Sequence, residues 1–190
     1  MLRSTLVALS LLIAPLAAHT DTTASSDGPP GSISFIAENL MSTANGVFHD
    51  WRIVRAEMDS ASPESGVVEV EVDIASVDTD NEQRDDHLRD PDFFEVEKWP
   101  TATVRVHSAT PDGTSDRGNP RYRAKFDIRI RDVAKTVDGA FELVSDSPPG
   151  VEGELTLNRV DFGVGGPYSW WNPGSIREEI PIRFEATFTR

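Results

Sequence analysis

The residues best placed to do chemistry gather in the charged stretch 78–90. His87 lies near three carboxylates in the sequence, those of Asp85, Asp86 and Asp90. An imidazole grouped with carboxylates can bind a divalent metal. However, no two histidines have a metal-binding spacing such as that of the HExxH motif. We therefore interpret the stretch as a solvated, charged helix and predict no metal site.

Motifs for covalent catalysis and phosphate binding are missing from the sequence. The chain has no cysteine, and it contains no GxSxG nucleophile motif. Asp161-Phe162-Gly163 matches a kinase triplet, but no glycine-rich loop or catalytic-loop motif accompanies it. The nearby glycines do not fit a dinucleotide-binding pattern. We predict that the protein is not an enzyme and uses no cofactor.

Aromatic side chains offer a different chemistry, the burial of an apolar ligand. They form three groups along the chain: Phe48 with Trp51, Phe93 and Phe94 with Trp99, and Phe162 with Tyr168, Trp170 and Trp171. The plain alternative is that these rings only pack a core. Each buried ligand CH₂ contributes about 0.8 kcal/mol. A long apolar ligand could therefore bind tightly without leaving any sequence motif.

The elements that must position these rings are strands. Apolar and polar residues alternate in about eight segments, most clearly over 122–130 and 180–188. Such alternation indicates one buried and one solvated face per strand, which is typical of antiparallel sheets. We predict an all-β fold with a single eight-stranded antiparallel barrel, because closure removes exposed edges. A two-sheet sandwich is the alternative.

One short helix is expected near residues 80–90. Thr79 and Glu82 have the spacing of a capping box, with Thr79 as the N-cap, and Asp90-Pro91 should end the helix. A helix this short and polar is unstable in isolation. We expect it to be held by packing of Leu88, Phe93 and Phe94 against the barrel.

The N-terminus has the features of an export signal. Arg3 precedes an apolar run over 6–16 and a pair of small residues, which predicts a signal peptide over residues 1–18. A flexible leader over 19–31 and one domain over 32–190 follow. The absence of cysteine excludes a lipoprotein anchor. These features predict an exported protein of the periplasm or the extracellular space.

Charge narrows the choice of partners. The formal net charge is -14 and the pI is about 4.6. Nucleic acids and anionic lipid head groups both select basic surfaces, so we predict no nucleic-acid partner. The only long apolar run is the signal segment, which is short for a bilayer span, so stable membrane insertion is not expected. A homodimer is left open.

Several motifs resemble those of the YceI-like family of lipid- and polyisoprenoid-binding proteins. The stretch 81–102, NEQRDDHLRDPDFFEVEKWPTA, is similar to the family's N-x-x-R-D-x-H-L segment followed by D-F-F and Pro-Thr. Residues 158–163, NRVDFG, resemble its N-R-x-D-F-G motif. This resemblance implies a lipocalin-like barrel with a helix at its side, exported by a bacterium. It also implies an isoprenoid ligand, such as a quinone or polyprenyl carrier.

The sequence departs from the family pattern in places that bear on the ligand. The segment 38–45 lacks the His and the glycine that many members carry after the first strand, and Arg131-Asp132 stands where the family often has a glycine. The loop 168–173 is also unusually aromatic.

We therefore predict that an isoprenoid or other long apolar lipid binds inside the barrel for carriage or sequestration. The expected cavity-lining residues are Phe126, Ile128, Phe141, Leu155, Phe162 and Phe184, with Trp170 and Trp171 near an opening. The alternative function is that of a solid-cored, acidic envelope or stress protein that acts through its surface without a ligand.

Overall fold

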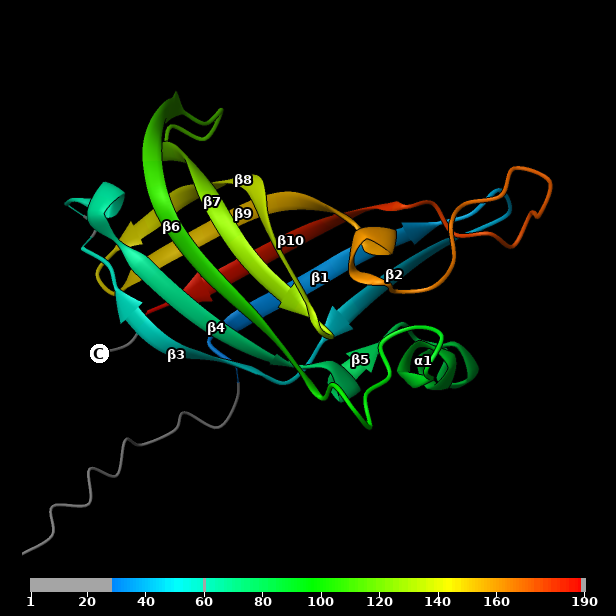
Figure 1. Ribbon diagram of the computed structural model, residues 1–190. Helices are drawn as coiled ribbons and strands as arrows, with labels where there is room; N and C mark the ends of the chain where they lie inside the picture. The colour runs from blue at the N-terminus through cyan, green and yellow to red at the C-terminus, as the bar shows by residue number, and fades with distance from the viewer. Residues whose placement is uncertain (1–28, 60, 189–190) are drawn as a thin grey trace, which may run out of the picture.

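Antiparallel strands dominate the computed structural model, which describes residues 29–59 and 61–188 (Figure 1). The predicted signal peptide and most of the predicted leader lie outside these residues. Among the described residues, no helix combines the length and apolar character needed to cross a membrane.

Ten strand segments form a single sheet in the order β3-β4-β6-β7-β8-β9-β10-β1-β2-β5. All of the pairings are antiparallel, as predicted. The segments are β1 (Gly31–Glu38), β2 (Thr43–Phe48), β3 (Trp51–Glu57), β4 (Val67–Asp73), β5 (Val77–Asp78), β6 (Thr101–Thr114), β7 (Pro120–Ile130), β8 (Val133–Asp146), β9 (Pro149–Asn158) and β10 (Glu179–Thr187).

The prediction of eight strands differs from the ten observed because two long strands bend. Only His49 and Asp50 separate β2 from β3, and the 3-10 helix η2 (Ile74–Ser76) separates β4 from β5. The two bends face each other, since Phe48 pairs with Val77 and Trp51 pairs with Val72. Counting each bent strand once restores the eight runs that the sequence pattern predicted.

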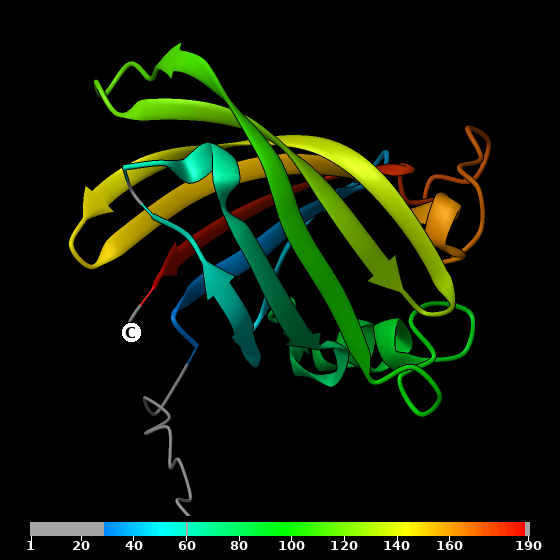
Figure 2. The ribbon, with the colours of Figure 1, turned by 60° about the vertical axis from the view of Figure 1, so that its left-hand side comes forward.

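The sheet curls into a barrel because the bent strand β2–β3 has neighbours on both sides. β2 pairs with β1 and β5, β3 pairs with β4, and β1 pairs with β10, so the ring of paired strands closes through the bent strand β2–β3. Figure 2 shows how strongly the sheet curls. β3 remains at the end of the strand order. Its charged residues Arg52, Arg55 and Glu57 suit a strand edge, because edge charges discourage pairing with other chains.

The interior of the barrel follows the period-2 pattern of the sequence. On β7, Ala124, Phe126 and Ile128 are buried, while the intervening residues 125, 127 and 129 lie on the outer face. The main core cluster joins these residues to Phe141, Leu155 and others on β8 and β9. The barrel interior is therefore apolar along its length.

The helix α1 (Glu82–Arg89) begins later than the capping box predicted. Asn81 is the N-cap, and its side chain accepts a hydrogen bond from the Arg84 amide at 3.0 Å. Thr79 is instead buried against Asp85, whose Oδ1 accepts a hydrogen bond from the Thr79 amide at 3.0 Å. This tertiary contact removes Thr79 from capping. The C-cap at Asp90 is as predicted.

The segment after α1 packs against the barrel through its two phenylalanines, as the sequence analysis expected. Phe93 and Phe94 are half-buried against the main cluster, and Phe94 also contacts the cluster around Trp51. Arg131, in the turn between β7 and β8, also fixes this segment through polar contacts. Its guanidinium donates hydrogen bonds to the Phe93 carbonyl at 3.0 Å and to Glu95 Oε2 at 2.7 Å.

Candidate functional site

An apolar cavity of about 230 Å³ runs through the barrel. Inward-facing side chains from every strand except β5 line it. Only three of the lining residues are ionisable: His107, Arg159 and Glu185. Packed protein interiors contain few voids larger than one water, so this cavity is far more than a packing defect. Large cavities with apolar walls stay dry and accept apolar ligands.

The lining residues extend from one end of the barrel to the other. Met58 and Pro63 line it beyond the C-terminal end of β3, and Ala37 and Ile176 line it at the opposite end. The cavity is therefore elongated along the barrel axis, which suits a chain-like ligand better than a compact one.

Glycines on the inner face explain why the barrel is not filled by its own aromatic rings. A β-carbon added at Gly46 would lie 2.2 Å from Phe35 Cζ, and one added at Gly153 would lie 2.3 Å from Phe184 Cζ. At Gly139 the nearest atom would be Phe126 Cε2, at 2.6 Å. Each ring thus lies flat across a neighbouring strand, where a side chain would otherwise stand.

Six of the eight residues predicted to contact a ligand lie in the cavity wall. They are Phe126, Ile128, Phe141, Leu155, Phe162 and Phe184. Phe126 and Phe184 come from strands on different parts of the sheet, yet their ring centroids are 5.7 Å apart. The structure brings these six together, and their role as ligand contacts remains a prediction.

The other two predicted residues, Trp170 and Trp171, do not line the cavity. Their side chains are 74% and 73% exposed, in the loop between the 3-10 helix η3 (Arg159–Phe162) and β10. Figure 1 shows this loop projecting from the barrel.

Part of the wall comes from α1 and the segment after it, which the sequence did not predict. Leu88 of α1 and Phe93 and Phe94 after it line the cavity as well as attaching the helix. The adjacent phenylalanines indicate that this segment packs against an apolar surface. The sequence does not show that this surface is the cavity.

Arg159 is a buried cation at the cavity wall that the sequence analysis did not single out. Its guanidinium donates hydrogen bonds to the carbonyls of Arg177 at 3.0 Å, Val164 at 2.8 Å and Ile176 at 2.6 Å. Burial lowers the pKa of this guanidinium, and the negative charge of Glu178 opposes the shift. Because three carbonyls surround it, Arg159 fixes both ends of the loop that carries the tryptophans.

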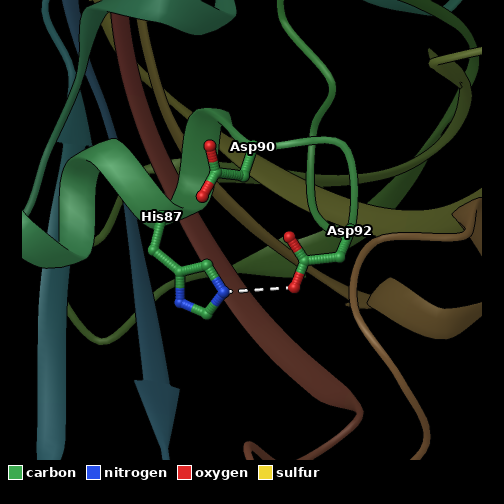
Figure 3. Close-up of side chains that lie close together, drawn as sticks. All are labelled: His87, Asp90 and Asp92. Atoms are coloured by element: carbon green, nitrogen blue, oxygen red, sulfur yellow. Dashed lines mark hydrogen bonds and ion pairs between the residues drawn. The ribbon is translucent and has the colours of Figure 1, made fainter.

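The histidine of the charged stretch lies outside the cavity. His87 Nε2 is 3.1 Å from Asp92 Oδ2, and Asp90 lies close by, with the three side chains exposed (Figure 3). Two of the three carboxylates that lie near His87 in the sequence point elsewhere, because Asp85 contacts Thr79 and Asp86 pairs with Arg89. We assign no metal to this exposed group.

The residues 161–163 that match a kinase triplet form the end of a 3-10 helix. η3 ends at Phe162, and Gly163 follows in the left-handed conformation with φ 69°. Phe162 is fully buried in the main core cluster. The triplet therefore serves to end the helix and pack the core.

The chain is similar to known proteins over nearly its whole length. A family model described as YceI-like domain matches residues 25–188. A UPF0312 protein from Pseudomonas savastanoi pv. phaseolicola is 30% identical over 199 residues, covering 97% of each chain. A UPF0312 protein from Ectopseudomonas mendocina is 32% identical over 177 residues, covering 86% of this chain and 88% of the relative.

Solved structures share the fold at lower identity. BcnA of Burkholderia cenocepacia aligns with a TM-score of 0.71 and 21% identity, covering 84% of this chain and 96% of that one. A polyisoprenoid binding domain from Saccharophagus degradans aligns with a TM-score of 0.58 and 15% identity, covering 85% and 97%. These likenesses establish a common barrel architecture.

Proposed function

The chain belongs to the YceI-like family, and on this premise we propose that it is a binding protein that holds a long apolar lipid inside its barrel. The observation that carries the proposal is the elongated cavity of about 230 Å³ with almost entirely apolar walls. Such a cavity offers burial of hydrocarbon as its main source of affinity.

An isoprenoid chain is the ligand class that we favour. The support comes from the similar fold of a domain described as polyisoprenoid-binding, together with the shape of the cavity. An isoprenoid is a linear hydrocarbon with regular methyl branches, and it makes dispersion contacts along its whole length. The apolar wall supplies such contacts from Ala37 at one end to Met58 at the other.

Binding, rather than catalysis, is what the wall supports. The three ionisable residues that line it lie on different elements: His107 on β6, Arg159 on η3 and Glu185 on β10. General acid–base chemistry needs such groups within hydrogen-bond reach of one reacting atom. The guanidinium of Arg159 is already bonded to main-chain carbonyls.

The test is extraction of the purified exported protein into organic solvent, followed by mass spectrometry. We expect a co-purifying isoprenoid lipid, or saturable binding when a prenyl quinone is added to the protein without lipid. If repeated preparations contain no lipid and bind no added prenyl quinone, the proposal is wrong.

A cavity-blocking variant makes the test specific to the barrel interior. Ala109 is buried and lines the cavity, so the ring of Ala109→Phe would occupy ligand space. We expect the affinity for the prenyl quinone to fall by about tenfold or more. The control is Ala134→Phe, at an exposed position of β8, which should bind like the unmodified protein.

The solid-cored alternative makes the opposite prediction. A barrel filled by its own side chains would have no room for a ligand, and the observed cavity counts against that arrangement. Under this alternative, Ala109→Phe would destabilise the fold by overpacking and would not alter lipid binding.

We also propose that the protein is exported, on the evidence of the charged, apolar and small-residue pattern over 1–18. The experiment is cell fractionation followed by N-terminal sequencing. The expected mature protein begins at His19 in the periplasmic or extracellular fraction. A cytoplasmic protein that retains Met1 would contradict export.

A further inference from the structure

We propose that two loops at one end of the barrel form a membrane-docking tip for an uncharged or zwitterionic bilayer surface. The tip consists of the β1–β2 turn, residues 39–42, and residues 163–176 of the loop between η3 and β10. The four side chains that define it are exposed and apolar: Leu40 at 55%, Met41 at 79%, Trp170 at 74% and Trp171 at 73%.

The two loops belong to one end of the molecule. Both project beyond the same end of the barrel, away from the C-terminus (Figure 1). Their bases are joined, because the Arg177 amide donates a hydrogen bond to the Glu38 carbonyl at 2.8 Å and the two side chains pair at 3.8 Å. A single surface can therefore contact both loops.

The tryptophans are presented by a structured turn. The Ser169 amide donates to Ser175 Oγ at 2.8 Å, and the Asn172 amide donates to the Ser169 carbonyl at 3.0 Å. Trp170 and Trp171 lie at the apex of this turn, with ring centroids 5.7 Å apart. The loop backbone thus holds both indoles in solvent, although bulky aromatic side chains normally bury most of their surface.

The charge distribution identifies the partner. Asp, Glu, Lys and Arg make up 26% of the chain, yet none of them occurs in residues 39–48 or 162–176. A tip without charges can enter the interfacial region of a bilayer without desolvating an ion. Tryptophan is enriched at that interface because its ring is apolar and its N–H is polar.

The charges nearest to the tip determine which kind of lipid head group it prefers. At the base of the tip the carboxylates of Glu38 and Glu178 outnumber Arg177. A negative surface potential acts only over about a Debye length, so these nearest charges are the ones that anionic head groups repel. The tip therefore suits zwitterionic lipid. Binding of this kind scales with the apolar area inserted and is reversible, in contrast to a membrane span.

The tip also lies at one end of the cavity. Ala37 and Ile176, which line the cavity, lead directly into the two loops. A docked barrel would present this end of the cavity to the bilayer, so that a lipid could pass between them with little exposure to water. This role in ligand transfer rests on the proposed function, whereas docking itself does not.

Co-sedimentation with vesicles tests the docking. The unmodified protein should bind vesicles of phosphatidylcholine alone, and binding should weaken when half of the lipid is phosphatidylglycerol. Trp170→Ala with Trp171→Ala should lower the partition coefficient by about tenfold for each tryptophan. Met41→Asp should lower it as well, because the charge must then enter the interface.

The matched control is Val54→Ala with Val144→Ala, which trims two exposed apolar side chains on strands away from the tip. This control should bind vesicles like the unmodified protein. If the unmodified protein does not bind, or the tryptophan variant binds equally well, docking is overturned. If the tryptophans instead hold a dimer together in sedimentation velocity and vesicles are not bound, the tip is a self-association surface.

A second measurement separates this proposal from the proposed function. Trp170 and Trp171 are outside the cavity wall, so their double variant should bind a prenyl quinone in solution with unchanged affinity. If the unmodified protein binds vesicles but no prenyl quinone, docking stands and the proposed isoprenoid ligand is wrong. If it binds a prenyl quinone but no vesicles, the proposed function stands and docking is wrong.

Discussion

Phe184 lies in the space that a side chain on Gly153 would need. The two residues are paired across β9 and β10, and a β-carbon at Gly153 would be 2.3 Å from Phe184 Cζ and 2.5 Å from the Ala140 carbonyl oxygen. Gly153→Ala must therefore move the ring toward the cavity and shift the backbone.

This contact predicts that Gly153→Ala lowers the free energy of unfolding by about 1–3 kcal/mol, the range for overpacking a core. Urea denaturation measures it. The control is Gly166→Ala, since an added β-carbon there has no atom within 4 Å. That variant should be unchanged or up to about 1 kcal/mol more stable. Equal stability of the two variants would contradict the packing argument.

Arg131 provides a second prediction, because its contacts offset an unfavourable backbone. Its φ is 56°, a conformation that favours glycine, while its guanidinium bonds to Phe93, Gly163 and Glu95. Arg131→Gly loses the contacts and relieves the strain, whereas Arg131→Ala loses the contacts and retains the strain.

Both Arg131 variants should be less stable than the unmodified protein, by roughly 1–3 kcal/mol for the lost charged hydrogen bonds. The alanine variant should be the less stable of the two by about 1 kcal/mol. Thermal unfolding of the pair measures the difference. An alanine variant as stable as the glycine variant would show that the backbone at this turn relaxes.

Arg159 provides a third prediction, which concerns the order of the tryptophan loop. Arg159→Met leaves three main-chain carbonyls without their donor and should lower the free energy of unfolding by about 2–4 kcal/mol. Hydrogen exchange at the Arg177 amide should accelerate, because that amide belongs to the loop base. Arg129→Met, on the exposed outer face of β7, should change stability by less than about 0.5 kcal/mol.

Asp127 provides a prediction about pH. The Thr136 hydroxyl, which lies opposite on β8 and donates to Asp127 Oδ1 at 2.6 Å, and then His107 hold the pKa of this carboxyl below its usual value. A lowered pKa adds stability that is complete above the usual carboxyl pKa and is lost as the pH falls through the lowered one. The effect should be small, because solvent screens an exposed group.

Thr136→Val should raise the pKa of Asp127 toward its usual value, and carboxyl ¹³C NMR titration measures the change. The stabilising contribution would then disappear at a higher pH than in the unmodified protein. Thr156→Val, at an exposed position of β9, is the control and should leave the Asp127 titration unchanged. A titration unaffected by Thr136→Val would assign the shift to His107.

The sequence predicted the strands well, but it predicted only part of the cavity wall. The alternation around Phe126 reports which side chains face inward, because one face of each strand is buried. It cannot report that the ring of Phe126 lies flat over Gly139, since that contact joins two strands. The cavity depends on such contacts between strands.

Local signals failed where tertiary contacts decided the outcome. Thr79 and Asn81 are both good N-caps by residue type, and the burial of Asp85 against Thr79 selected Asn81. The sequence of the loop 168–173 is unusually aromatic, but it does not show that a turn holds both tryptophans away from the cavity. The hydrogen bonds of Arg159 to both ends of the loop join residues that are distant from the apex in the sequence.

The pairing of β1 with β10 has a consequence for how the chain folds. Ile33 pairs with Phe184, so the contact that completes the barrel joins the first and last strands of the domain. Closing so long a loop is entropically expensive, and chains rich in distant contacts fold slowly. During synthesis the barrel cannot close until β10 has emerged. The inner apolar faces therefore stay open to solvent, or to a chaperone, until the final strand is in place.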